Sequence, residues 1–471
     1  MIDKVKENKA MLILCITLLC PPVGFVLALV GLCRDFDRWK TYIFCIAWGL
    51  AVFAYCYVPT VEADMVRYFQ YLDELKGVPF SEAATIGRFG HQRNYSFIYY
   101  CWLFSNLGLK RLVPAIPVFF IYYTGLYVTF RVGTDLRARH RDILTYAFIM
   151  LLTLNFFGVE NNVRNVSAFC MITLAVFRET YLKKRDIWTL ILYIFPVFLH
   201  TTAIIFLLLR VMVGILRHIK CRYQLMFIFI AAIPAIPSVL RLLYEQLRYT
   251  TSDNLIIHTL INVIKTANAY YTYSDAEWAV AVAQSGSEQV AKILYSVFTL
   301  TTIVIILLHW FAPFSKVKPL GTRIKKCLTL GFGADKGVVA APSDDAADVP
   351  TDTFESVSER LSFFMDYEFF VGGLTLAMVP MVMPEYWRFV SVIIVFGGVF
   401  YLLTKANGTG FPIAKKLLWI FLILAPLCAA LWGRNWILYT DGVKTILHAM
   451  ICNPIVVFIA KFCGNSLAFL L

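Results

Sequence analysis

Six arginines and one histidine are the side chains of this sequence best suited to holding an anionic substrate and moving a proton. The arginines fall at the ends of apolar segments that the charge pattern assigns to one side of a membrane, and they are Arg67, Arg88, Arg93, Arg164, Arg388 and Arg434. Arginine binds phosphate oxygens through parallel N–H groups, so arginines around one mouth would suit a pyrophosphate held at a membrane surface. The alternative is that each pairs with a nearby carboxylate or extends towards lipid headgroups.

The histidine is His200, which interrupts an apolar run and is followed by two threonines. A histidine side chain exchanges its proton near neutral pH, and at a break between two helices it can meet a substrate. A lone histidine in an apolar segment is more often a structural residue, and this alternative stays open.

A carboxylate and a tyrosine, Asp64 and Tyr68, are spaced four residues apart, which places them on one helical face with Arg67 beside them. This position, just beyond an apolar segment, suits a catalytic or acceptor-binding carboxylate. The alternative is an aspartate that caps its own helix.

Two further polar groups could bind sugar hydroxyls. Glu160, Asn161 and Asn162 precede Arg164, and they either contact a sugar or cap the helix that follows. A second group, Asp275, Glu277 and Trp278, offers carboxylates and an aromatic face, which suit pyranose rings.

The composition shows which elements must position these residues. Of the 471 residues, 59% are apolar and 15% are charged, against about 45–50% and about 25% in soluble globular proteins. The net charge of +13 does not indicate a nucleic-acid binder, because the basic residues form short clusters between apolar runs. The twelve cysteines form no CxxC pair and no histidine cluster accompanies them, so we expect neither a metal, nor a cofactor, nor a disulfide framework. The sequence therefore predicts an all-α polytopic membrane protein.

Apolar segments that could cross a membrane, for which about 20 residues suffice, recur along the chain. Ten lie near 41–58, 112–130, 143–158, 161–181, 223–242, 291–313, 362–383, 388–404, 414–432 and 442–463. Two more runs are interrupted: 11–33 by Pro21-Pro22, and 187–217 near His200. Together they predict about 11–13 transmembrane or re-entrant helices in one polytopic domain.

The basic clusters predict the orientation of these helices. Five basic clusters lie on the cytoplasmic side together only if 187–217 enters the membrane and returns as two short helices. These clusters are within 131–141, 183–185, 217–222, 316–326 and 405–416. The turn at His200 then faces outward. Basic residues flank 11–33 on both sides, which favours a re-entrant hairpin turning at the prolines over a single crossing.

The same orientation assigns the long connections to the two faces of the membrane. Residues 59–94 and 243–290 become long extracytoplasmic loops, and the aromatic segment 95–110 suits a helix at the outer interface. Residues 314–361 become a cytoplasmic loop that is partly disordered at 336–356, where small and acidic residues dominate.

Four motifs in this order resemble the EpsG-like, Wzy-type bacterial polysaccharide polymerases. They are the D-x-x-x-Y of Asp64 and Tyr68, the Arg164-containing segment 161–168, the His200-containing segment 198–205, and Pro384-Glu385-Tyr386-Trp387-Arg388-Phe389. The resemblance covers roughly residues 40–405. Two positions depart from the family pattern: Glu62 stands where glycine is common, and Gln92-Arg93-Asn94 stands where glutamate is common.

The resemblance implies a GT-C-like glycosyltransferase in the bacterial cytoplasmic (inner) membrane, with its active site facing outward. Such an enzyme transfers a growing glycan from undecaprenyl pyrophosphate to the next lipid-linked repeat unit, without metal, nucleotide or other cofactor. Its expected partners are the lipid-linked glycan, membrane lipid and a chain-length regulator protein, but no nucleic acid.

The roles we assign follow residue type and motif order. Arg164, Arg388 and Arg67 would bind the pyrophosphate. His200 or Asp64 would take the proton from the acceptor hydroxyl. The sugar-binding residues would be Tyr68, Glu160, Asn161 and Asn165.

Three other functions remain open from the sequence. A polysaccharide ligase would use the same donor with another acceptor. A lipid-linked oligosaccharide flippase would be a transporter, and it would favour repeated full-length spans with polar residues along a central cavity. A sugar O-acyltransferase would need an acyl-donor pocket at the inner leaflet.

Overall fold

The computed structural model describes most of the chain up to Tyr439. The described ranges are 2–60, 63–86, 94–232, 235–247, 286–311, 354–380, 383–406 and 412–439, with isolated positions at 249–250, 257–258, 261, 264–265, 268, 441, 444–445 and 448–449. Every regular element in these ranges is helical. The prediction of an all-α chain is therefore confirmed for the part of the sequence that the structure describes.

Within these described ranges, four segments are long and apolar enough to cross a membrane. They are Leu112–Asp135, Gly286–Trp310, Tyr386–Ala406 and Ile413–Leu431. They correspond to α7 (Leu112–Asp135), α17 (Gly286–Phe311), α20 (Met383–Phe396) with α21 (Gly398–Ala406), and α22 (Pro412–Tyr439). Their length and composition indicate a helical membrane protein.

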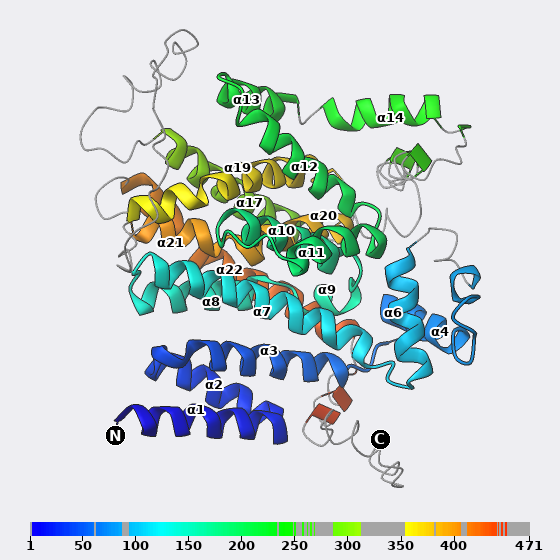
Figure 1. Cartoon of the computed structure of the whole chain (residues 1–471), viewed down its shortest axis with the longest axis vertical. Helices are drawn as coiled ribbons and strands as arrows, with labels where there is room; N and C mark the ends of the chain where they lie inside the picture. The colour runs from blue at the N-terminus through cyan, green and yellow to red at the C-terminus, as the bar shows by residue number, and fades with distance from the viewer. Residues whose placement is uncertain are drawn as a thin grey trace.

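The first three helices lie side by side along one edge of the bundle (Figure 1). They are α1 (Ile2–Leu19), α2 (Pro21–Arg34) and α3 (Trp39–Tyr55), and a 3-10 turn, η1 (Phe36–Arg38), joins the last two. The chain breaks at Cys20 because Pro21 and Pro22 cannot continue α1, whereas proline is well tolerated in the first turn of α2. The run 11–33 thus contains two helices that pack against each other.

The centre of the bundle is built around α7 and α10 (Asn165–Thr180). Helix α7 packs against α3, α8 (His140–Thr153) and α21. Helix α10 packs against α11 (Ile187–Leu199), α12 (Ala203–Leu216), α19 (Phe354–Ala377) and α20. The buried residues of both helices are mainly apolar or small. Because each helix packs against several others, burial of these residues holds it in place.

Three of the expected single spans are divided in the structure. The segment 143–158 contains the end of α8 at Thr153 and the start of α9 (Phe156–Asn161). The segment 388–404 is interrupted at Gly397, where an added Cβ would collide with the Tyr146 hydroxyl. That hydroxyl donates to the Ile394 carbonyl at 2.8 Å. The segment 223–242 forms α13 (Arg222–Ala232) and α14 (Ile236–Leu247), with Pro237 in the first turn of α14.

One end of the bundle carries a small helical layer, at the right of Figure 1. It contains α4 (Asp64–Glu74), the 3-10 turn η2 (Ala83–Thr85) and α6 (Tyr95–Asn106). Trp102 Nε1 donates to the Val78 carbonyl at 2.7 Å, and Ser105 donates to the Leu72 carbonyl. Both α4 and η2 belong to the segment expected as an outer loop, 59–94, and both pack against the aromatic helix α6.

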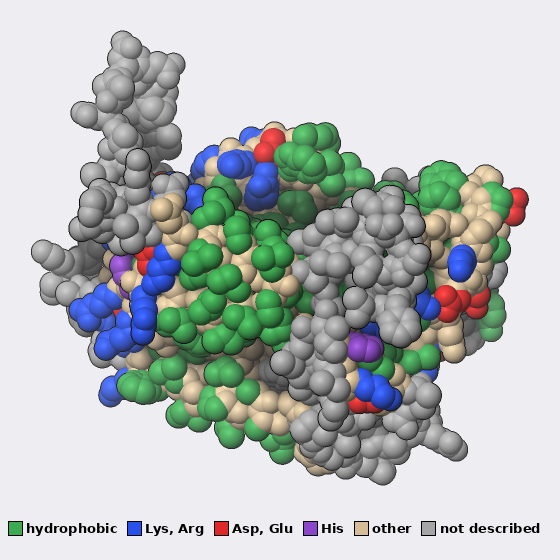
Figure 2. Space-filling view, turned by 90° about the horizontal axis from the view of Figure 1, so that it is seen from below, with side chains coloured by type: hydrophobic (Ala, Val, Ile, Leu, Met, Phe, Trp, Pro, Cys, Tyr) green, Lys and Arg blue, Asp and Glu red, His purple; other side chains and the backbone are tan. Residues whose placement is uncertain are grey.

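Large apolar side chains are exposed on several helices, and Figure 2 shows them covering much of one face, with lysines and arginines gathered at its left end. Among the exposed apolar side chains are Trp188 and Ile194 of α11, Leu208 and Ile215 of α12, and Trp419 of α22. An apolar surface of this extent is unusual for a soluble monomer and suits contact with lipid.

Several expectations lie outside the described residues. They are nearly all of the span 442–463, nearly all of 251–285 within the second expected outer loop, and 312–353 of the expected cytoplasmic loop.

Candidate functional site

The structure brings together three of the residues singled out from the sequence: Asn165, His200 and Arg388. In the amide orientation that matches donors to acceptors, the Asn165 nitrogen donates to His200 Nε2 at 2.8 Å. The Asn165 oxygen accepts from Arg388 Nη1 at 2.9 Å and from Nε at 2.8 Å. A single amide thus bridges the histidine and the guanidinium group.

Local sequence explains how His200 reaches this point. Helix α11 ends at Leu199, with Pro196 in its last turn, and His200 then adopts an extended backbone before α12 begins at Ala203. Helices α11 and α12 then run back beside each other, and Glu179 of α10 contacts both of them, through Tyr193 of α11 and Arg210 of α12. The break predicted near His200 therefore forms a turn between two adjacent helices.

The hydrogen bonds of His200 also indicate its tautomer. The Thr202 N–H points to Nδ1 at 3.3 Å, while the Asn165 amide points to Nε2 at 2.8 Å. A neutral imidazole has only one acceptor nitrogen, so these two contacts compete. The shorter contact favours the tautomer with its proton on Nδ1 and a lone pair on Nε2.

Arg388 is oriented by a second amide as well. Its Nε donates to Asn162 Oδ1 at 2.8 Å, and Asn162 in turn donates to the Gly158 carbonyl at 3.0 Å. A Cβ added at Gly158 would lie 2.8 Å from the Trp387 ring, so glycine permits the close approach of α9 (Phe156–Asn161) to α20. Because both amides are neutral, they orient the guanidinium group without cancelling its charge.

Arg164 supplies a second positive charge beside the histidine. The side chain is half-buried, its charge acts on His200, and its guanidinium carbon lies 5.2 Å from the centroid of the Phe97 ring. Tyr68 packs edge-on against the same ring, with centroids 5.5 Å apart. Helices α4 and α6 are therefore coupled to the cluster through aromatic contacts, and Tyr68 itself is buried.

Asp64 and Arg67 are placed differently from the cluster. They form an ion pair with each other at 3.2 Å on the exposed side of α4, where their side chains are 49% and 63% exposed. The anchoring of α4 comes from Asn161, whose Oδ1 accepts from the Met65 N–H at 3.1 Å. The Asn161 amide nitrogen donates to the Phe157 carbonyl at 3.0 Å and to the Tyr57 hydroxyl at 3.3 Å. Asn161 thus positions α4 in this structure.

Glu160, expected at a sugar-binding position, is fully buried. Neither of its carboxyl oxygens has a hydrogen-bond partner within the part of the chain that the structure describes. Burying a polar group without a partner destabilises a fold by about 1–3 kcal/mol.

Replacing Glu160 with methionine is therefore expected to raise the melting temperature of the purified protein by about 2 °C. Glu160→Gln is the control, because it keeps the shape and a buried polar group, and it should leave the melting temperature nearly unchanged. A marked loss of stability in both variants would show that the carboxyl group has a stabilising partner.

Sequence reasoning singled out Asn162 and Asn165, but not the hydrogen bonds by which both orient Arg388. It also missed Phe169, whose ring packs edge-on against His200 with centroids 5.9 Å apart. Asn162 lies within the motif that contains Arg164, so its position offered a signal. Phe169 has no comparable signal in an apolar segment.

Other predicted positions cannot be compared with the cluster. Arg88, Arg93, Asp275, Glu277 and Trp278 lie outside the described residues, and the side chain of Arg434 is likewise not described. Among the residues that are described, no group of three or more His, Cys, Asp or Glu side chains could hold a metal ion.

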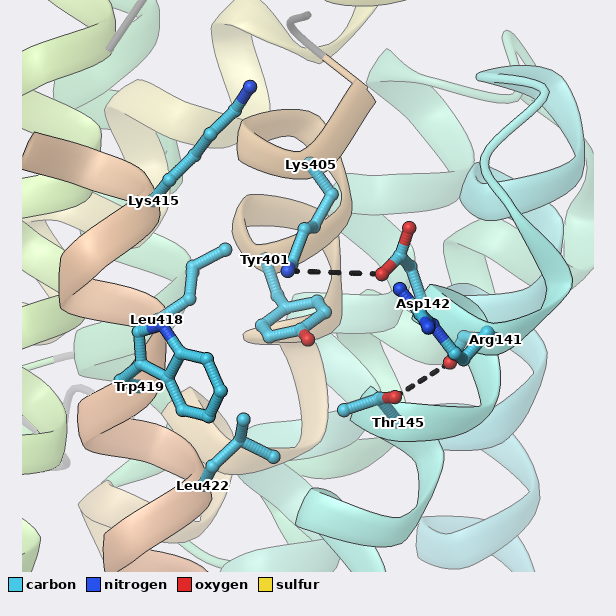
Figure 3. A pocket seen from close by; sticks show the side chains of 9 residues that line it. All are labelled: Arg141, Asp142, Thr145, Tyr401, Lys405, Lys415, Leu418, Trp419 and Leu422. Atoms are coloured by element: carbon cyan, nitrogen blue, oxygen red, sulfur yellow. Dashed lines mark hydrogen bonds and ion pairs between the residues drawn. The ribbon is translucent and has the colours of Figure 1, made fainter. Parts of the chain in front are cut away.

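The cluster lies at one end of α10, and basic residues gather at the other. Helix α10 begins with Asn165 and has Arg178 in its last turn, and 16 residues of helix span about 24 Å. A cavity of about 320 Å³ lies between α8, α21 and α22, where Lys405 contacts Asp142 at 3.8 Å and Arg141 and Lys415 line the wall (Figure 3).

Comparison with known proteins gives no match: no family model, no curated protein and no solved structure is similar to this chain.

Proposed function

We propose that this chain is a glycosyltransferase of the bacterial cytoplasmic membrane that polymerises lipid-linked oligosaccharide repeat units. The observation that carries the proposal is the Arg388–Asn165–His200 chain of hydrogen bonds, with Arg164 beside it. Two guanidinium groups and a neutral histidine are suited to a substrate with an anionic leaving group and an acceptor that must lose a proton.

The arginines would act on the leaving group. As the acceptor oxygen bonds to the anomeric carbon, the bond from that carbon to the pyrophosphate oxygen breaks and its electron pair leaves with the undecaprenyl pyrophosphate. Arg388 and Arg164 would stabilise the negative charge that develops on this oxygen. The amides of Asn162 and Asn165 hold Arg388 in place before substrate arrives, so little reorganisation is needed.

His200 would receive the acceptor proton on Nε2. The acceptor hydroxyl would replace the Asn165 amide as the hydrogen-bond donor to that nitrogen. A third positive charge beside Arg164 and Arg388 is unfavourable, so bound pyrophosphate would be what makes protonation of the ring acceptable. Proton transfer would then depend on the presence of the donor substrate.

Helix α4 would form the acceptor side of the site. Asp64 and Arg67 are exposed, and Tyr68 touches the ring on which Arg164 rests. These residues would contact the incoming lipid-linked repeat unit, with Arg67 supporting the pyrophosphate and Asp64 as the alternative proton acceptor. The basic clusters at the far ends of α10 and α12 favour a cytoplasmic location for that end, and hence an outward-facing site.

The test uses purified protein in nanodiscs, a defined undecaprenyl-pyrophosphate repeat unit, EDTA and no nucleotide sugar. We expect a ladder of longer lipid-linked glycans. Transfer to a different acceptor without a ladder would identify a ligase. Movement of the lipid across a liposome bilayer without a new glycosidic bond would identify a flippase, and either result would overturn the proposal.

A further inference from the structure

A basic cavity of about 550 Å³ lies at the end of the bundle opposite His200. Its walls come from the ends of α10 and α12, from the start of α19 and from the connection between α10 and α11. Five cationic side chains line it: Lys183, Arg185, Arg210, Arg217 and Arg360. Two carboxylates, Glu179 and Glu359, line it as well, so positive charge is in excess.

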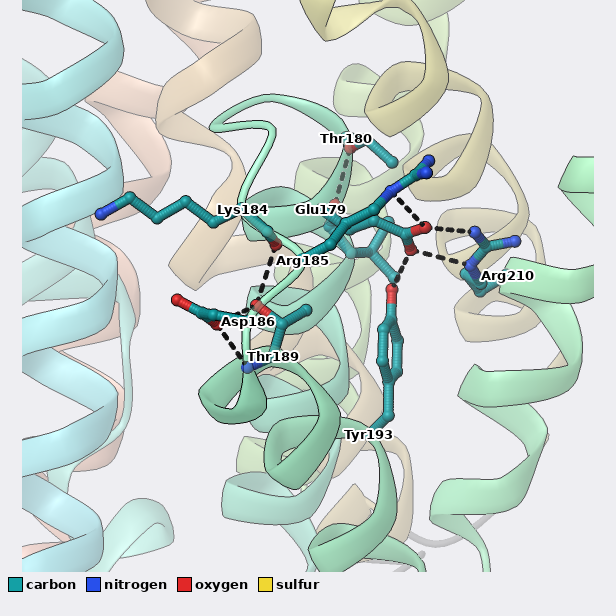
Figure 4. Close-up of polar contacts among 9 residues, drawn as sticks. Glu179, Thr180, Lys184, Arg185, Asp186, Thr189, Tyr193 and Arg210 are labelled. Carbon is teal, nitrogen blue, oxygen red and sulfur yellow. Dashed lines mark hydrogen bonds and ion pairs between the residues drawn. The ribbon is translucent and has the colours of Figure 1, made fainter.

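One of these carboxylates is already fully engaged by the protein (Figure 4). Glu179 accepts from Arg210 Nε at 3.1 Å, from Arg210 Nη2 at 2.7 Å and from the Tyr193 hydroxyl at 2.8 Å. The bidentate contact fixes the plane of the Arg210 guanidinium group. Glu179 therefore acts as a support for Arg210, and its single charge is shared between Arg210 and the more distant Arg185.

Two guanidinium groups converge on one aromatic ring inside the cavity. The guanidinium carbons of Arg210 and Arg217 each lie 5.4 Å from the centroid of Phe363. Arg217 also donates to the Ser362 hydroxyl at 2.9 Å and lies 3.7 Å from Asp366. Both guanidinium groups also line the cavity, so a phosphate bound there would face two arginines.

The rim of the cavity carries two cations on a well-defined turn. Asp186 ends this turn by accepting from the Thr189 N–H at 2.9 Å and from Arg178 at 2.8 Å. The Thr189 backbone hydrogen bond and the Arg178 contact lower the pKa of Asp186 to about 2. Lys183 has a positive φ of 56°, and Arg185 is 80% exposed and only 3.7 Å from Glu179. Lys183 is exposed at this rim, and Arg185 can exchange its 3.7 Å contact with Glu179 for a bound anion.

The helices beside the cavity expose apolar side chains. Leu208, Val211 and Ile215 are exposed on α12, and Ile187 and Trp188 are exposed at the start of α11 next to the rim. A soluble phosphate would need only the cations. A lipid needs cations at headgroup depth and an apolar surface beside them for its acyl chains, and this arrangement provides both.

We propose that this cavity binds the phosphate of an anionic phospholipid from the leaflet at that face. Arg210 and Arg217 would hold the phosphate oxygens, and Lys183 and Arg185 would close over the headgroup. Among its described lining residues, the cavity between α8, α21 and α22 in Figure 3 has three cations, one of which is paired with Asp142, and Arg141 is the one guanidinium. The proposal is independent of the polymerase function, because it concerns a separate site and is read out by lipid binding.

The test measures thermal stabilisation of the full-length protein in a neutral detergent by dioctanoyl phosphatidylglycerol. We expect saturable stabilisation. The apparent Kd should rise about 25-fold in K183Q/R185Q, because each cation removed from beside an anionic lipid raises it roughly fivefold. The matched control is R137Q/R139Q, which also removes two exposed cations at this end, one of them at a positive φ. Its apparent Kd should change less than about threefold.

Two further arms separate the sources of the phosphate. Dioctanoyl phosphatidylcholine, which carries the same phosphate without net charge, should stabilise weakly, and millimolar inorganic phosphate should neither stabilise nor compete. The double variant E179Q/R210Q removes the supporting pair without leaving an unpaired carboxylate, and it should weaken phosphatidylglycerol binding as well. An equal rise in apparent Kd in K183Q/R185Q and in the control R137Q/R139Q would indicate a diffuse effect of surface charge and overturn the proposal. Competition by inorganic phosphate would assign the cavity to a soluble anion and overturn it too.

Discussion

Replacing Arg388 with glutamine is expected to lower the initial rate of glycan polymerisation about a thousandfold. Removing one preorganised donor from the position where negative charge develops costs about 10²–10³ in rate, and Arg388 supplies both a charge and a planar fork. The structure holds this fork with two asparagine amides, through contacts of 2.8–2.9 Å. The variant should remain folded, because glutamine can still bond to an amide.

The measurement is the rate of ladder formation with saturating lipid-linked repeat unit, together with the melting temperature. Arg388→Lys keeps the charge but loses the bidentate geometry, so we expect an intermediate loss of about 30-fold. Arg139→Gln, an exposed arginine at the opposite end of the bundle, is the control and should retain the full rate. A rate for Arg388→Gln within threefold of the original would remove Arg388 from the pyrophosphate site.

The helical character of the chain and several element positions could be predicted because they depend on local pattern. The apolar run at 112–130 became α7, and the polar break after Leu199 became the turn at His200. Both signals are local: the first is one continuous apolar run, and the second is a proline followed by polar residues. Such patterns act directly on the helix that contains them. The ion pair between Asp64 and Arg67 is local as well, since residues three apart meet on a helix.

The contacts that assemble the cluster could not be predicted in this way. Arg388 and Asn162 are 226 residues apart in the chain, and no local pattern specifies that they meet. The same holds for the interruption at Gly397, which depends on the Tyr146 side chain arriving from another helix. Long-range packing decides these features, and one sequence carries no direct record of it.

The burial of Glu160 shows where residue type alone misleads. A glutamate before Arg164 at a helix end suggested a side chain available to sugar hydroxyls, but the structure encloses it completely. The side-chain amide of the neighbouring Asn161 forms hydrogen bonds with the α4 backbone and with Tyr57. Polar side chains at a helix end form hydrogen bonds with the protein backbone as readily as with a ligand.

Replacing His200 with alanine is expected to lower the polymerisation rate by about 10³, within the range of 10²–10⁴ typical of a general base. The structure offers two ways for His200 to act: it can accept the proton itself, or it can hold Asn165, which in turn orients Arg388. His200→Gln separates them, because its carbonyl oxygen can accept from the Asn165 amide but cannot take up a proton at neutral pH.

If His200 is the base, the glutamine variant should be as slow as the alanine variant, and the rate of the original enzyme should fall at low pH in a step that both variants lack. If His200 only positions Asn165, the glutamine variant should recover most of the rate and keep the original pH profile. Asp64→Asn completes the experiment, since Asp64 is the other candidate base on the exposed side of α4. A large loss in Asp64→Asn combined with recovery in His200→Gln would transfer the proton-accepting role to α4 and leave His200 as the residue that holds the Asn165–Arg388 pair.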